Sequence, residues 1–342
     1  MQTDDFDHEL PPDRIAQHPI VPRDQARLLV VRRGLGTWEH RIFADLPELL
    51  APGDVLVRNV TRVVPARIFG RRRQTGGQWE GLYLRTLADG TWEVLATTRG
   101  HPRVGEAIQI GEALALTLLE RKGDGRWIVR PDRDEPAVTL LERVGTVPLP
   151  PYIRKGREGP GDRERYQTVF ASNPGSVAAP TAGLHFTALL LHRLEKRGIS
   201  PVDVTLHVGI GTFRPIETER VEDHVLHAEW GEVGKQAVER LVNARAHGAR
   251  IVAVGTTSAR MLETAAQSGG FRSFAGETNL FIRPGHVFRG LDALITNFHL
   301  PRSSLLVLVS ALAGPDLIRA AYAEAIKERY RFYSYGDAML IL

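Results

Sequence analysis

Hydrophobic and polar positions divide the chain into three regions with different periodicities. Residues 6–66 contain short mixed elements, with apolar runs at 28–31 and 55–57 that are typical of buried strands. Between residues 68 and 147 apolar and polar positions alternate with a period of two. After the proline-rich stretch 148–151, strand-like and helix-like patterns follow one another. The pattern therefore predicts an α/β fold interrupted by an all-β region.

The middle region carries the turn signals of a small antiparallel fold. The turn at 88–90 separates the alternating runs 79–85 and 91–96, and the turn at 122–125 leads into the run 126–129. Both turns contain Asp-Gly, a strong hairpin signal because glycine supplies the positive φ that such turns require. Repeated hairpins in this short region predict a small antiparallel β-barrel or β-sandwich.

The third region predicts the α/β parent, with Thr187 as a helix N-cap and Gly198 just past that helix. We expect an α/β domain formed by residues 1–67 and 148–342, with residues 68–147 inserted as an all-β domain. The strands expected in the third region are 176–179, 202–207, 251–254, 280–282 and 293–295, and the helices are 187–197, 236–247, 258–267, 303–312 and 316–329.

Composition excludes several classes of protein. With 342 residues, 43% of them hydrophobic, the chain is too apolar for disorder and long enough for two domains. The absence of cysteine excludes disulfides, a thiolate nucleophile and cysteine-ligated zinc. The acidic start does not resemble a secretion signal, and the longest apolar stretch, 305–313, is shorter than the ~20 residues that span a bilayer. We expect a soluble, cytoplasmic protein without membrane contact.

Charge favours contact with a polyanion, although weakly. The net charge is +4, and 39 of the 44 basic residues are arginine, which suits phosphates and stacked bases but also follows from GC-rich codon usage. Aromatic residues at 330–335 suit base stacking and a core position about equally. The basic patches that could contact RNA are the run 71–73 and the group Arg154, Lys155, Arg163 and Arg165 near Tyr166.

Loops at strand ends carry the candidate chemistry. The Gly-Thr-Thr-Ser segment 255–258 lies between a buried strand and a helix, so it suits an anion or a ribose as well as a simple capped turn. His185 and His207 lie in successive loops of the third region. Each is a proton carrier or a structural histidine, and the two loops should meet at one edge of the sheet.

A further cluster contains His224, His227 and Glu229. Its spacing is compatible with a metal site, but it lacks helical i, i+4 spacing and additional ligands. An acid/base or structural role is therefore the better interpretation, and we expect no metal.

The ordered blocks of this chain resemble the S-adenosylmethionine:tRNA ribosyltransferase-isomerase family of queuosine biosynthesis. The most specific block is 176–187, and 205–213, 255–258 and 292–301 follow in the family's order. The chain departs from the family pattern at Val60, where an aspartate is usual, and at Ala259 and His286.

The resemblance implies a barrel-like α/β catalytic domain with an inserted small antiparallel β-barrel. It also implies that the ribosyl group of S-adenosylmethionine is transferred to tRNA and isomerised. The acceptor would be the wobble base 7-aminomethyl-7-deazaguanine, and the products epoxyqueuosine-tRNA, adenine and methionine. This chemistry needs a base, an acid for the departing adenine and donors for an aldehyde oxygen. We expect no cofactor, because S-adenosylmethionine is consumed as a substrate, and we expect a monomer.

The resemblance and the loop positions together give candidate roles. His185 or His207 is the expected base, and His227 with Glu229 the expected acid/base pair. The residues expected to bind substrate are Arg62, Thr181, Thr256, Thr257, Ser258, Arg260, Asn297 and His299, and those expected to bind tRNA are Arg154, Lys155, Arg163, Arg165 and Tyr166.

Two other classes remain open from the sequence. A binding module would hold modified tRNA or a nucleoside without chemistry, but such a protein needs no convergent histidines and hydroxyls. An RNA methyltransferase would yield S-adenosylhomocysteine, and the chain has no G-x-G-x-x-G loop after an early strand. Analysis of the products separates the three classes.

Overall fold

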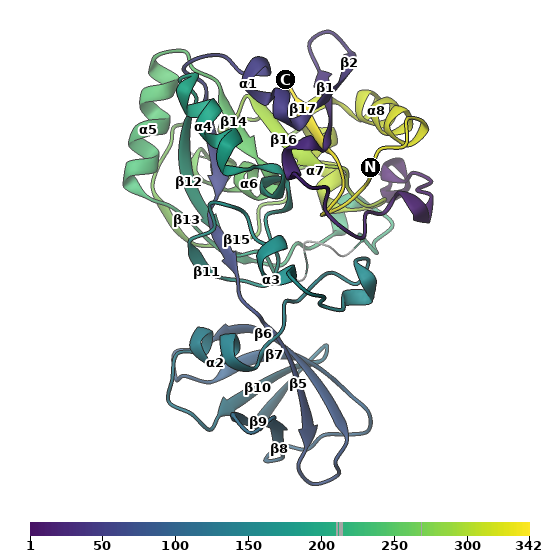
Figure 1. Ribbon diagram of the computed structural model, residues 1–342, viewed down its shortest axis with the longest axis vertical. Coiled ribbons are helices and arrows are strands. Elements are labelled where there is room, and N and C mark those ends of the chain that lie inside the picture. The colour runs from purple at the N-terminus through teal and green to yellow at the C-terminus, as the bar shows by residue number, and fades with distance from the viewer. Residues whose placement is uncertain (210, 212–214, 268) are drawn as a thin grey trace. The chain divides into compact units, whose positions relative to one another are not determined.

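The computed structural model describes residues 1–342 except 210, 212–214 and 268, and it contains two compact units (Figure 1). The larger, called the sheet unit here, consists of residues 1–61, 167–173 and 179–342. The smaller, called the barrel unit, consists of residues 62–166 and 174–178.

A nine-stranded mixed sheet forms the centre of the sheet unit. Four neighbouring strands in its middle run parallel, whereas antiparallel partners extend the sheet at both sides. In spatial order the strands are β15 (Phe274–Thr278), β13 (Glu229–Val233), β12 (Ser200–Leu206), β3 (Val55–Asn59), β14 (Ile251–Val254), β16 (Ala293–Asn297), β17 (Ala338–Ile341), β1 (Arg27–Arg32) and β2 (Thr37–Ile42).

Helices cover the sheet and bury its apolar side chains. Leu190 and Leu194 of α4 (Ala188–Lys196) pack with Leu56 of β3 and Val252 of β14 in one core cluster. The helix α6 (Gly255–Ala265) contacts β12, β3, β14 and β16 and is buried along nearly its whole length. The other helices of this unit are α1 (Leu46–Leu49), α5 (Lys235–Ala246), α7 (Ser304–Ala313) and α8 (Pro315–Lys327).

The barrel unit contains the inserted fold expected from the alternating pattern. Its closed barrel has the order β10 (Arg126–Pro131), β7 (Trp92–Thr98), β6 (Gln78–Thr86), β5 (Arg67–Arg72), β8 (Ala107–Ile110) and β9 (Leu114–Gly123), with antiparallel pairing throughout. Gly90 and Gly125 have positive φ in the two turns, as expected. The helices α2 (Ala137–Val144) and α3 (Asp162–Arg165) complete this unit, and β4 (Thr61–Val63) pairs with β11 (Asn173–Ser176).

The predicted fold class, α/β with an inserted antiparallel β-barrel, is confirmed, while the α/β parent, expected to be barrel-like, is a nine-stranded mixed sheet. The domain boundaries expected between residues 67 and 68 and between residues 147 and 148 stay a prediction. By their contacts, residues 62–67 and 148–166 belong to the same compact unit as the barrel. One reason is Arg67, whose Nη1 donates to the carbonyl of Gly156 at 2.7 Å.

Three local predictions were wrong. The strand expected over 176–179 ends at Ser176, because the segment that pairs with β4 is Asn173–Ser176. The helix expected from Ser258 begins at Gly255, because a φ of +84° there lets the chain turn from β14 into α6 without a loop. Residues 280–282 form no strand; the antiparallel partner of β13 is β15, and Ile282 is a buried loop residue.

Within the described residues, no single helix has both the length and the apolar composition needed to cross a membrane. Taken together, α7 and α8, which are bent relative to each other, have a combined length and apolar composition that a membrane span would need.

Candidate active site

The carboxyl ends of the four parallel strands lie at one edge of the sheet. His207 directly follows β12, Thr61 lies two residues after β3, α6 starts directly after β14, and Asn297 is the last residue of β16. Sheets of this kind bind ligands outside the carboxyl ends of their strands. Parallel pairing therefore assembles hydroxyl, amide and imidazole groups from distant parts of the sequence.

A pocket of about 330 Å³, including the part open to solvent, lies at this edge. Segments 179–182, 255–257 and 296–299 line it, together with Val208 and Leu305. The structure thus brings together five of the residues expected to bind substrate: Thr181, Thr256, Thr257, Asn297 and His299.

His185 is a buried residue that holds the pocket-lining side chain of Asn297. Asn297 Nδ2 lies 3.2 Å from His185 Nε2, and Asn297 Oδ1 accepts a hydrogen bond from Thr181 Oγ1 at 2.8 Å. The amide therefore occupies the lone pair of Nε2. Burial, with Phe43 stacked on the ring at 5.0 Å, lowers the pKa of His185 to about 3. This imidazole is neutral and holds Asn297 in place.

His299 is also buried and neutral. Its Nε2 lies 2.7 Å from Thr296 Oγ1, and its backbone N–H donates to the Tyr322 hydroxyl at 2.9 Å. Burial lowers the pKa of His299 to about 3. The residue lines the pocket, so its role there is that of a neutral hydrogen-bonding group.

His207 has the geometry expected of a general base. Its Nδ1 lies 2.7 Å from Thr61 Oγ1, and Trp230 stacks on its ring at 5.2 Å. Thr61 Oγ1 also donates a hydrogen bond to the carbonyl of Asn173 at 3.5 Å. Because the single hydroxyl proton is used there, Thr61 Oγ1 accepts the hydrogen bond from His207 Nδ1–H. That tautomer, inferred from the hydrogen bonds, leaves the lone pair on Nε2.

The protonation state of His207 supports this role. The ring is half-buried, and burial lowers its pKa below the ordinary histidine value, so the imidazole is neutral near pH 7. Val208, the next residue, lines the pocket.

The start of α6 carries hydroxyls without protein partners. Thr257 Oγ1 and Ser258 Oγ are buried and make no hydrogen bond among the described residues. Thr256 and Thr257 line the pocket where the first amides of the helix are unsatisfied by helical bonds. Buried polar atoms normally find a partner, so these hydroxyls indicate a ligand at the helix start.

Glu229 and Arg260 form a buried ion pair. Arg260 Nη1 donates to Glu229 Oε2, and the N–H of Gly209 donates to Glu229 Oε1 at 2.6 Å. Arg260 also donates to the carbonyls of Leu280 and Thr278 at 3.2 and 3.3 Å. Both side chains are therefore committed to holding the segment after β12.

The two histidines before Glu229 are more accessible. His227 is exposed and lies so close to Gly211 that a Cβ there would come within 2.7 Å of its ring. His224 packs edge-on against Phe281 at 5.5 Å, and burial lowers its pKa. The described residues contain no group of three or more His, Asp or Glu arranged to hold a metal ion. The expectation of no metal and no cofactor stays a prediction.

The barrel unit holds the basic residues expected to bind tRNA and also Arg62. Arg154 pairs with buried Asp162, and Arg62 donates to Glu142 at 3.0 Å. Arg163 is exposed and donates to the carbonyl of Gly145 at 2.7 Å; Lys155 and Arg165 are exposed as well. Tyr166 is fully buried, so its ring offers no face for base stacking.

A sequence model of the family described as queuosine biosynthesis protein matches residues 3–341. The chain belongs to this family. It is 52% identical to the S-adenosylmethionine:tRNA ribosyltransferase-isomerase of Symbiobacterium thermophilum and 49% identical to that of Desulfitobacterium hafniense, over 100% of each chain. The crystal structure of S-adenosylmethionine tRNA ribosyltransferase from Thermotoga maritima matches 99% of this chain and 100% of its own, with a TM-score of 0.58 and 40% identity. The resemblance expected from the sequence is confirmed.

Sequence reasoning missed several residues that shape the site of this family member. Thr61 and Trp230 hold His207, and Asn59 Oδ1 accepts from the N–H groups of Thr61 and Leu206 at 3.1 Å each. The available signal was the position of Asn59 and Thr61 just after a buried strand. For Trp230 no local signal exists, because its contact with His207 follows from the pairing of β12 with β13.

Proposed function

We propose that this protein transfers and isomerises the ribosyl group of S-adenosylmethionine onto tRNA. The acceptor is the aminomethyl group of 7-aminomethyl-7-deazaguanine at the wobble position, and the products are epoxyqueuosine-tRNA, adenine and methionine. The observation that carries this proposal is that relatives 52% and 49% identical over the full chain are S-adenosylmethionine:tRNA ribosyltransferase-isomerases. The protein would act in the cytoplasm as a monomer, without a cofactor.

In this proposal His207 is the base that starts the reaction. The positive sulfur acidifies the neighbouring C5′–H, and a neutral imidazole with a free Nε2 can take that proton. The Thr61 hydroxyl at Nδ1 supports the role, because it fixes the tautomer and would stabilise the imidazolium that forms. His185 is the weaker candidate, since Asn297 occupies its Nε2.

The remaining steps follow from the ylide at C5′. Elimination across the ribose opens the ring and releases adenine, leaving an aldehyde and a vinyl sulfonium. The acceptor amine adds at C4′ and regenerates an ylide, whose carbon closes onto the aldehyde. The resulting alkoxide displaces methionine and forms the epoxide. The exposed His227 is the candidate acid that protonates the departing adenine.

The start of α6 is the proposed anchor for S-adenosylmethionine. Thr256 and Thr257 line the pocket and offer hydroxyls and helix N-terminal amides to a carboxylate or ribose, whereas Ser258 is fully buried and does not line it. Thr181, Asn297 and His299 line the other side of the pocket and would hold the opened sugar. Arg260 and Glu229 act as positioning residues, because they pair with each other.

The alternatives make different products. A binding module for modified tRNA would release nothing, and a methyltransferase would release S-adenosylhomocysteine. The names of the relatives favour catalysis over simple binding.

The test is the release of adenine from S-adenosylmethionine, with and without tRNA that carries the aminomethyl-deazaguanine wobble base. We expect adenine and methionine only with that tRNA, and a tRNA with guanine at the wobble position is the matched control. A folded protein that binds both substrates but releases no adenine would contradict the proposal. Release of S-adenosylhomocysteine would identify a methyltransferase instead.

A further inference from the structure

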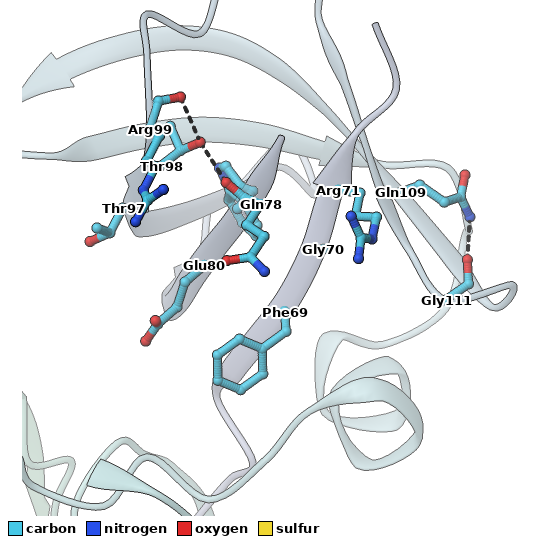
Figure 2. Close-up of a pocket in the computed structure, with 11 residues that line it drawn as sticks. Phe69, Gly70, Arg71, Gln78, Glu80, Thr97, Thr98, Arg99, Gln109 and Gly111 are labelled. Atoms are coloured by element: carbon cyan, nitrogen blue, oxygen red, sulfur yellow. Dashed lines mark hydrogen bonds between the residues drawn. The ribbon is translucent and has the colours of Figure 1, made fainter. Parts of the chain in front are cut away.

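An open groove runs over the outer face of the barrel unit. The side chains of β5, β6 and β7 line it, together with Gln109 of β8 (Figure 2). Its volume is about 690 Å³, within the ~300–1,000 Å³ of typical small-molecule pockets, and it is open to solvent. What the groove binds is therefore decided by the residues that line it.

Positive charge is concentrated in this unit. The barrel unit contains 19 Arg and Lys residues against 14 Asp and Glu, whereas the sheet unit contains 25 against 26. The whole net charge of +4 thus comes from the smaller part of the chain. Such segregation is the electrostatic signature of a surface that binds a polyanion.

Two arginines of the groove are available to a ligand. Arg71 on β5 and Arg99 just after β7 are both exposed, and neither pairs with a carboxylate among the described residues. The acidic residue that lines the groove, Glu80, lies 3.5 Å from Arg67. The groove therefore offers two guanidinium groups whose charge is not cancelled by a neighbouring carboxylate.

The position of Arg99 is fixed from inside the barrel. Buried Arg72 forms an ion pair with Glu106, with Nε 2.6 Å from Oε1, and its Nη1 donates to the carbonyl of Arg99 at 3.2 Å. A second bond from Arg72 holds the carbonyl of His101 at 3.3 Å. The loop that carries Arg99 is thus anchored, which reduces the entropy lost when its side chain binds a ligand.

An exposed aromatic ring lies beside these arginines. Phe69 is 54% exposed and lies two residues before Arg71 on the same face of β5. Across the sheet Arg71 is paired with Gln78, whose side chain is exposed, and Phe69 is paired with Glu80. An exposed ring next to an exposed guanidinium and an exposed amide matches the needs of an unstacked base and its phosphates; Arg71 Nη1 itself donates to the carbonyl of Gly76 at 3.3 Å.

We propose that this groove binds a single-stranded segment of RNA, with a base stacked on Phe69 and phosphates held by Arg71 and Arg99. The inference rests on the proposed function, which supplies tRNA as the partner. It extends that function to a surface outside the pocket at the edge of the nine-stranded sheet. Duplex RNA is a poorer ligand for it, because paired bases cannot stack on an aromatic side chain.

The test measures binding of the full-length protein to a fluorescent anticodon stem–loop RNA at several salt concentrations. For the double variant Arg71→Gln, Arg99→Gln we expect weaker binding and a slope of log K against log salt that is shallower by about 1.4, or ~0.7 for each lost phosphate contact. Phe69→Leu should weaken binding about five-fold or more without changing the slope. The matched control Arg133→Gln removes an exposed arginine of the same unit outside the groove.

The outcomes separate this inference from the proposed function. If the groove variants bind RNA as tightly as the parent and the parent releases adenine, the proposed RNA-binding role of the groove is wrong and the proposed function stands. If the parent releases no adenine but the groove variants lose RNA binding, the groove is still an RNA-binding surface and the proposed function is wrong. If Phe69→Leu has no effect and a duplex competes as well as a single strand, the face is a nonspecific polyanion surface and the proposal is wrong. Thermal melting shows that each variant folds.

Discussion

At the scale of single residues, the environment of each histidine decides its chemistry more than its place in a motif. His185 and His207 occupy comparable loops, yet His185 Nε2 accepts a hydrogen bond from an amide, whereas His207 Nε2 has no partner among the described residues. The difference arises from Thr61, whose hydroxyl accepts a hydrogen bond from His207 Nδ1–H. The proposed base therefore depends on residues from two strands: His207 follows β12, and Thr61, which fixes its tautomer, follows β3.

This assignment predicts that His207→Gln lowers adenine release by ~10²–10⁴ while S-adenosylmethionine still binds. Thr61→Val should lower the rate about ten-fold, because the imidazole loses the hydrogen bond that fixes its tautomer.

The same assignment predicts the pH dependence of the parent. Its rate should fall as the pH drops, since protonation of His207 removes the lone pair that takes the substrate proton. Burial lowers the pKa of His207, so this decline should occur below the ordinary value of ~6.5. Single-turnover rates across pH test it, and a rate of His207→Gln near that of the parent would remove this residue as the base.

The ion pair between Glu229 and Arg260 gives a second prediction at this scale. Arg260→Met leaves a buried carboxylate without its counter-ion, so we expect the free energy of unfolding to fall by ~3–5 kcal/mol. The double variant Arg260→Met, Glu229→Gln should recover much of this loss, because no unpaired charge remains. Urea unfolding of the variants measures both effects. Unchanged stability with a raised KM for S-adenosylmethionine would instead indicate direct binding of substrate by Arg260.

At the scale of elements, the start of α6 is the feature on which substrate binding depends. Thr257→Val keeps the shape of the side chain and removes a hydroxyl that has no protein partner among the described residues. We expect the fold to be as stable as the parent and the affinity for S-adenosylmethionine to fall about 3- to 100-fold, the range for one hydrogen bond to a neutral or charged group. Calorimetric titration measures the affinity.

The same helix supplies the control for this prediction. Thr264 lies further along α6, and its hydroxyl lies 2.9 Å from that of Thr278. Thr264→Val should therefore cost about 1 kcal/mol of stability and leave the affinity for S-adenosylmethionine unchanged. An unchanged affinity in Thr257→Val as well would show that this hydroxyl does not contact the ligand.

Local patterns predict local elements well in this chain. The strand 251–254 is found at its predicted bounds, and Thr187 caps α4 by accepting from the N–H of Leu190 at 3.1 Å. Both features depend on neighbouring residues alone. The beginning of α6 was predicted too late, because a helix buried on nearly all sides lacks the amphipathic pattern that marks a boundary.

Contacts between distant residues could not be predicted from one sequence. Arg260 lies 31 residues from Glu229 and His185 lies 112 residues from Asn297, and tertiary packing alone joins them. The pattern indicated that the strand-end loops meet, but it did not indicate which polar groups pair with each other. The hydrogen bonds therefore assign Arg260 a positioning role in place of substrate binding, and His185 and Glu229 a positioning role in place of acid/base chemistry.

At the scale of the whole molecule, buried histidines make the stability of the sheet unit depend on pH. Burial lowers the pKa of His8 to about 4 and those of His185 and His299 to about 3, whereas an unfolded chain protonates all three near 6.5. Between these values the unfolded state binds more protons, so the free energy of unfolding falls as the pH drops. Each histidine contributes at most about 2 kcal/mol of loss between pH 7 and pH 5.

His8 allows this prediction to be tested with little change in packing. Its ring lies 5.1 Å from that of Tyr322 and 6.0 Å from that of Phe332, and its ring nitrogens have no partner among the described residues. His8→Phe keeps an aromatic ring and removes the titration, so the loss of unfolding free energy between pH 7 and pH 5 should shrink by up to ~2 kcal/mol. Urea titrations at the two pH values give the comparison, and an unchanged pH dependence in His8→Phe would mean that His8 takes up its proton in the folded state as well.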